Sequence, residues 1–108
     1  MASAFEGERF LNAVAVNGSG TATHYTVPAS RYTKFYIQNL TLPGSASSIT
    51  LGNTSLINTG SIQTWQPLIT SGSPSQTIEV ILTAGQTISS VNATAVQGTA
   101  LEFEDKNL

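Results

Sequence analysis

A chain of 108 residues is long enough for one domain with a single hydrophobic core. Only 9% of its residues are charged, against roughly 25% in a typical soluble domain, and the segment from Phe35 to Leu101 holds one formal charge, Glu79. The net charge of -2, with only four Lys and Arg residues, argues against nucleic-acid binding, and the absence of cysteine excludes disulfide bonds and thiolate metal sites.

The N-terminal part of the chain predicts an arm followed by three strands. Residues 1–9 are mixed in charge and mostly small, so we expect an arm that is ordered only by a contact. Apolar residues alternate in Phe10–Val16, which predicts a first strand. The turn signal at Asn17–Gly20 then predicts that Thr21–Val27 returns as a second strand. Aromatic and β-branched residues fill Tyr32–Leu42, which we predict to be a central strand.

The middle of the chain predicts shorter strands between Gly-rich and Ser-rich loops. Ser48–Leu51 and Leu56–Ile57 are brief apolar segments that end at Gly or Asn residues. Ser61–Leu68 also has the composition of a strand, and Pro67 confines that strand to an edge or an end of the sheet.

The C-terminal part predicts three further strands. In Gln76–Thr83 the apolar residues at even positions share one face and Glu79 lies on the other. Thr87–Ala95 and Thr99–Phe103 are predicted as separate strands. In the last of them the alternation predicts that Leu101 and Phe103 point inward, with the neighbouring glutamates pointing outward.

These elements predict an all-β fold. No window keeps a 3.6-residue apolar period, so no long helix is expected. About eight short strands at spacings of roughly 8–12 residues indicate an antiparallel β-sandwich or jelly roll. We expect one domain over residues 10–105, between the arm at 1–9 and a C-terminal tail at 106–108. The chain shows no signal peptide and no apolar segment of membrane-spanning length, so neither export nor a membrane partner is expected.

No constellation of residues predicts catalysis. His24 is the single histidine, and it lies in the middle of a predicted strand far from any carboxylate in sequence. Glu79 has no evident carboxylate partner for glycoside hydrolysis. The acidic residues near the C-terminus fit a solvated end, with a Ca²⁺ site as the alternative if the two termini lie together. We therefore predict no enzyme, no cofactor and no metal.

The tyrosines and the tryptophan allow two interpretations. Tyr25, Tyr32, Tyr36 and Trp65 would form a sugar-stacking platform if they shared one exposed face. Core or subunit-interface packing is the favoured interpretation, with Trp65 as the interface anchor, because tryptophan is enriched at interface hot spots. The low charge agrees with this, since little electrostatic repulsion opposes contact between copies.

Three segments together resemble small β-sandwich virion proteins of tailed bacteriophages, of the head decoration or cement type. They are VPASRYTKFYIQNLTL at 27–42, LTAGQTISS at 82–90 and GTALEFED at 98–105. The resemblance implies a structural protein, made in the bacterial cytoplasm, that binds the major capsid protein on the outer head surface. It also implies a homotrimer that bridges capsid subunits and so stabilises the shell. A tail or fibre component and a carbohydrate-binding module remain alternatives.

The predicted contacts follow from this layout. We expect Phe5, Arg9 and Phe10 to contact the capsid, because an arm can order on a partner surface. Tyr36 and Trp65 are expected in the oligomer interface, where charged residues are normally depleted. If the first and last strands pair, the terminal charges gather at one end of an otherwise neutral body.

Overall fold

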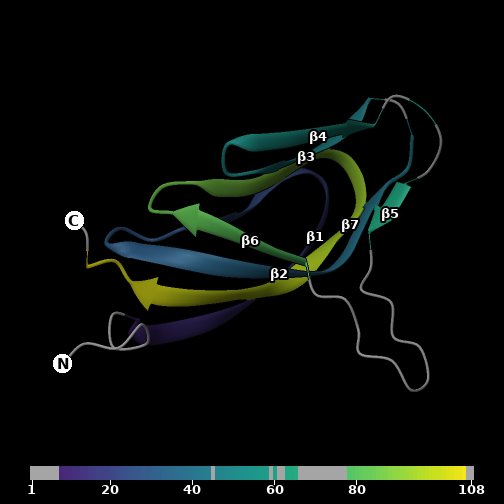
Figure 1. Ribbon diagram of the computed structural model, residues 1–108. Coiled ribbons are helices and arrows are strands. Elements are labelled where there is room, and N and C mark those ends of the chain that lie inside the picture. Colours follow the sequence, from purple (N-terminus) through teal and green to yellow (C-terminus); the bar gives the residue numbers. More distant parts are fainter. Residues whose placement is uncertain (1–7, 45, 59, 61–62, 66–77, 107–108) are drawn as a thin grey trace, which may run out of the picture.

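The computed structural model describes residues 8–44, 46–58, 60, 63–65 and 78–106 (Figure 1). Within them the chain forms seven strands, and all pairings are antiparallel, which confirms the predicted all-β antiparallel class. The strands are β1 (Phe10–Thr26), β2 (Arg31–Leu42), β3 (Ser47–Leu51), β4 (Thr54–Asn58), β5 (Gln63–Trp65), β6 (Ile78–Thr83) and β7 (Thr87–Glu104).

One continuous sheet contains all seven strands, and β7 lies at its centre. β1 follows one edge of β7 along nearly its whole length. On the other edge, the first half of β7 pairs with β3 and the second half pairs with β2, whose far edge pairs with β5 and β6. Because β7 changes partner halfway, the sheet curls into a half-barrel, with the β3–β4 part facing the β2–β6 part (Figure 1).

The predicted turn at Asn17–Gly20 is wrong. β1 is continuous across this segment and stays paired with β7. The pairing shifts register between Gly18 and Gly20 and again between Gly20 and Ala22. At both shifts β7 contributes the extra residue, as in a β-bulge, and bulges bend a strand without ending it. The predicted division of the last two strands is wrong for the same reason, since β7 is continuous through the bend.

Hydrogen bonds of His24 and Ser90 connect β1 and β7 at this bend. The Ser90 hydroxyl donates to the Gly20 carbonyl at 2.7 Å, and His24 Nε2 lies 2.6 Å from the same hydroxyl oxygen. The hydroxyl hydrogen of Ser90 is already donated to Gly20, so Ser90 must accept from the imidazole. The hydrogen in this contact is therefore carried by His24 Nε2, which donates to Ser90. The imidazole lies directly against Gly18, where any side chain would overlap it.

The hydrophobic core fills the space between the two parts of the curled sheet. Its largest fully buried apolar side chains are Phe35, Leu42, Ile49, Leu82 and Ile88. The predicted faces of β6 are confirmed where the side chains are described. Leu82 is buried and Val80 packs on the core, whereas Glu79 and Ile81 are exposed.

Candidate functional site

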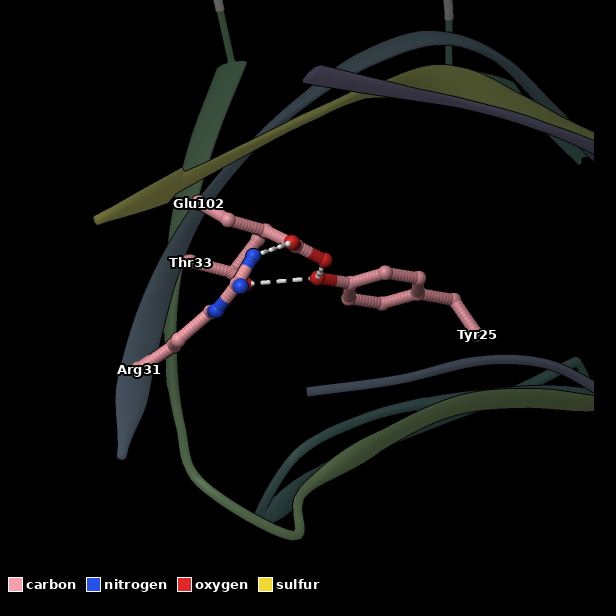
Figure 2. Close-up of polar contacts among 4 residues, drawn as sticks. All are labelled: Tyr25, Arg31, Thr33 and Glu102. Atoms are coloured by element: carbon pink, nitrogen blue, oxygen red, sulfur yellow. Dashed lines mark hydrogen bonds and ion pairs between the residues drawn. The ribbon is translucent and has the colours of Figure 1, made fainter. Parts of the chain in front are cut away.

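The inner face of the sheet carries a buried polar network, and here the predicted orientation of the last strand is wrong. Glu102 is only 2% exposed and points inward, while Leu101 and Phe103 lie on the outside. Arg31 donates to Glu102 Oε1 at 2.8 Å, and the Tyr25 hydroxyl donates to Oε2 at 2.5 Å (Figure 2). The Tyr25 oxygen also lies 2.8 Å from the hydroxyl of Thr33.

The network is closed and internally satisfied. The Tyr25 hydroxyl donates its one hydrogen to Glu102, so the Thr33 hydroxyl is the donor in the hydrogen bond between Thr33 and Tyr25. Burial, followed by the hydrogen bond to Glu102, raises the pKa of Tyr25 to about 12. No buried side-chain N or O atom in the described part of the chain lacks a partner. We therefore assign the network to stability, where it ties the end of β1 to β2 and β7.

The opposite side of the same strands exposes an apolar and aromatic surface. We call it the outer face, and it is defined by residues that the strand register places side by side. Ile81 and Phe10 are 59% and 56% exposed, and the other members are half-buried. The outer face consists of Phe10 on β1, Leu101 and Phe103 on β7, Tyr32, Lys34 and Tyr36 on β2, and Ile81 on β6, and the exposed Glu79 of β6 lies beside Tyr36 at its border.

Phe103 is the centre of an aromatic cluster on the outer face. The Tyr32 ring stacks on it with centroids 5.3 Å apart, and the Phe10 ring meets it edge-on at 5.9 Å. The Lys34 ammonium lies 5.1 Å from the centroid of the Phe103 ring, a cation–π contact. Such packing fixes the orientation of these side chains while leaving Phe10 mostly open to solvent.

The charged groups gather at the neighbouring end of the molecule, as predicted for pairing of the terminal strands. β1 begins opposite the end of β7, and Arg9 forms an ion pair with Glu104 at 3.3 Å. Lys34 forms a second ion pair with Glu8 at 2.8 Å, and this contact lowers the pKa of the Glu8 carboxyl. Both pairs are partly exposed, so each contributes little to stability.

The predicted contact residues fall in different places. Arg9 is exposed at the charged end, and Phe10 and Tyr36, which the sequence assigned to two different interfaces, lie together on the outer face. The backbone of Trp65, in β5, pairs with Leu40 of β2. The side chain of Trp65 and the whole of Phe5 fall outside the described residues.

The predicted sugar-stacking platform is divided by the fold. Tyr25 lies in the core, whereas Tyr32 and Tyr36 lie on the outer face. Beyond Tyr36 this side of the sheet becomes polar and forms an open hollow of about 320 Å³ lined by residues that include Gln97 and Asn17. Gln97 donates to Asn17 at 3.2 Å, so these amides are partly occupied by each other.

Sequence reasoning missed Phe103 and Leu101 as surface residues and Glu102 as a core residue. The signal that favours the correct face begins earlier in β7, where Val96, Gly98 and Ala100 alternate toward the core. At Gly98 the Phe35 ring fills the space that a side chain would need, so the inward side of β7 has a gap in its apolar pattern. The alternation of the larger apolar side chains of Leu101 and Phe103 therefore predicts that they mark the inward side of β7, although they lie on its outer side.

The described residues hold no metal cluster and no membrane-spanning helix. No group of three His, Cys, Asp or Glu side chains could hold a metal ion within the ranges that the structure covers. The same part of the chain contains no helix long and apolar enough to cross a membrane. Comparisons with protein-family models, with curated proteins and with solved structures found no match to this chain.

Proposed function

We propose that this chain is a structural protein that docks through its outer face onto another protein surface. The observation that supports the proposal most strongly is the exposure of Phe10 and Ile81 beside a fixed aromatic cluster. Contiguous exposed apolar surface costs solubility and is typical of interaction sites. Tyrosine and phenylalanine are also enriched at such sites, because they bury large area with few rotatable bonds.

The proposed partner is the major capsid protein on the outside of a bacteriophage head. The resemblance of residues 27–42, 82–90 and 98–105 to head decoration proteins supplies this choice. In this proposal each copy adds contact area between neighbouring capsid subunits and so raises the resistance of the shell to internal pressure. The finer architecture, a sandwich or jelly roll, belongs to the same proposal, as does the location on the virion.

The alternatives from the sequence differ in how well the geometry suits them. A tail or fibre component would use the same outer face, so only its place on the particle separates the two structural proposals. A carbohydrate-binding module is less well supported, because Tyr25 is buried away from Tyr32 and Tyr36.

Two isoleucines provide a matched test of the outer face. Ile81 is 59% exposed on β6 and belongs to the outer face, whereas Ile57 is 69% exposed on β4 and does not. We expect Ile81→Glu to weaken binding to purified heads at least about tenfold in co-sedimentation, because a charge would be buried in an apolar contact. Ile57→Glu should bind as the unaltered protein does.

Each substitution replaces an exposed side chain, so thermal unfolding should show little change in either variant. Equal binding by both variants, or no binding of the unaltered protein to heads that lack it, would contradict the proposal.

A further inference from the structure

We propose that the free edge of β1 pairs with the same edge of a second copy, antiparallel, to form a two-fold dimer. Within the described residues β1 pairs only with β7. In an antiparallel ladder the backbone N–H and C=O groups alternate between the two sides of a strand. A strand with one neighbour therefore presents about half of these groups to a second partner.

The first half of β1 lacks the features that usually protect an edge. Protective features are charge, proline, shortness and irregular pairing. Phe10–Gly18 contains neither a charged residue nor a proline, and its register with β7 is regular from Asn12 to Gly18. That regular part extends about 23 Å, at roughly 3.3 Å per residue.

The other edges in the described part of the chain are less open to pairing. β5 has three residues and β4 has five. β6 has six residues and carries Glu79, the isolated charge of the neutral body. The start of β1 is therefore the longest uncharged edge that the described strands present.

Charge placement favours a second copy in the antiparallel direction. Arg9 and its ion-pair partner Glu104 lie just before the regular part of β1. A parallel arrangement would place these charged ends side by side, with like charges opposed. The antiparallel arrangement places each charged end beside the neutral bend at Asn17–Gly20 of the partner.

Side-chain size also allows close pairing. Ala13 and Ala15 are exposed and lie on the same side of β1 as the outer face, since they pair with Leu101 and Thr99. Alanine leaves room for the side chains of an incoming strand, and an uncharged pair raises no desolvation penalty. Because the contact uses the same edge on both copies, it closes at two chains and does not propagate.

The symmetry has a consequence for docking that rests on the proposed function. Antiparallel pairing of identical edges requires a two-fold axis perpendicular to the sheet. This rotation leaves both outer faces pointing in the same direction. The dimer would then present two docking surfaces to one shell, which strengthens attachment by avidity. The threefold assembly implied by the resemblance is replaced by this two-fold arrangement.

Light scattering coupled to size exclusion tests the dimer without any capsid. The expected mass is twice the 11.3 kDa of the chain. The double variant Ala13→Lys/Ala15→Lys should elute at the mass of one chain, because the two-fold axis would gather four lysines from the two copies along the paired edge. The control Ile57→Lys/Ala84→Lys adds the same charge at exposed sites on β4 and in the β6–β7 turn, away from this edge, and should remain a dimer.

Each other outcome overturns the inference. A single-chain mass for the unaltered protein means that the edge does not pair, and a mass of three chains excludes the two-fold contact. A dimer that survives Ala13→Lys/Ala15→Lys uses a different surface. Ile81→Glu should lose head binding and remain a dimer, so the failure of the proposed function and the failure of this inference are distinguishable.

Discussion

At the scale of single residues, the most consequential side chain is Glu102, a carboxylate that the fold carries inside. A buried charge is tolerated only when it is paired and hydrogen-bonded, and Arg31 and Tyr25 meet this requirement. Arg31 remains one-third exposed, so its charge keeps part of its hydration. The residue in β7 that was predicted to be solvated thus fixes the packing of β1 against β2.

The raised pKa of Tyr25 predicts a specific dependence of stability on pH. A tyrosine in the unfolded chain ionises near pH 10, whereas Tyr25 in the folded protein holds its proton to about pH 12. Its contribution is therefore complete below pH 10 and is lost as the pH rises from 10 to 12, by roughly 2–3 kcal/mol. Urea unfolding across this range measures the loss.

The variant Tyr25→Phe isolates this residue from the other tyrosines. At neutral pH we expect it to be less stable than the unaltered protein by about 1–3 kcal/mol, because Glu102 and Thr33 each lose a partner. The difference between the two proteins should shrink above pH 10. A difference that stays constant up to pH 12 would show that Tyr25 does not hold its proton in this way.

At the scale of elements, strands were predictable and the bend was not. The sequence predicted β2 to within one residue and the inward side of β6, because each has strong apolar alternation and clear turn residues at its ends. The Asn17–Gly20 segment fits both a hairpin turn and a bulged bend. Which of the two forms depends on whether β7 pairs across it, and pairing over such a distance in sequence leaves no local signal.

The candidate site was predictable to a similar extent. Phe10 and Tyr36 were singled out from the sequence as contact residues, and that remains a prediction; their position on a common face depends on the register of β1, β7 and β2. At the end of β7 the apolar residues Leu101 and Phe103 alternate with glutamates, so alternation alone oriented Phe103 toward the wrong side of the sheet. Packing of Phe35 beside Gly98 decides that orientation, and a single sequence does not reveal it.

The bend itself is open to a double-mutant test. Gly18→Ala would place a methyl group against the His24 imidazole, so we expect a loss of about 1–3 kcal/mol in the free energy of unfolding. In a His24→Ala background the same change should cost much less. Gly44→Ala, where a methyl group meets only ordinary contact, is the control. Additive effects of the two substitutions would contradict the packing described for the bend.

At the scale of the whole molecule, the surface is divided by chemistry. Three ion pairs gather most of the charged groups where β1 begins, where β7 ends and in the adjoining part of β2. The rest of the described body is nearly neutral. The outer face lies next to the charged end, so a docking partner would meet apolar side chains bordered by charge. This is the common layout of protein interfaces, with an apolar centre and a polar rim.

The central claim is that the outer face attaches this protein to the head of a virion. Electron cryomicroscopy of intact particles measures this directly, because it gives both the location and the orientation of each copy. We expect density for the protein on the head, with β2, β6 and the end of β7 turned toward the shell. Density at the tail, or on the head with β3 and β4 toward the shell, would contradict the claim.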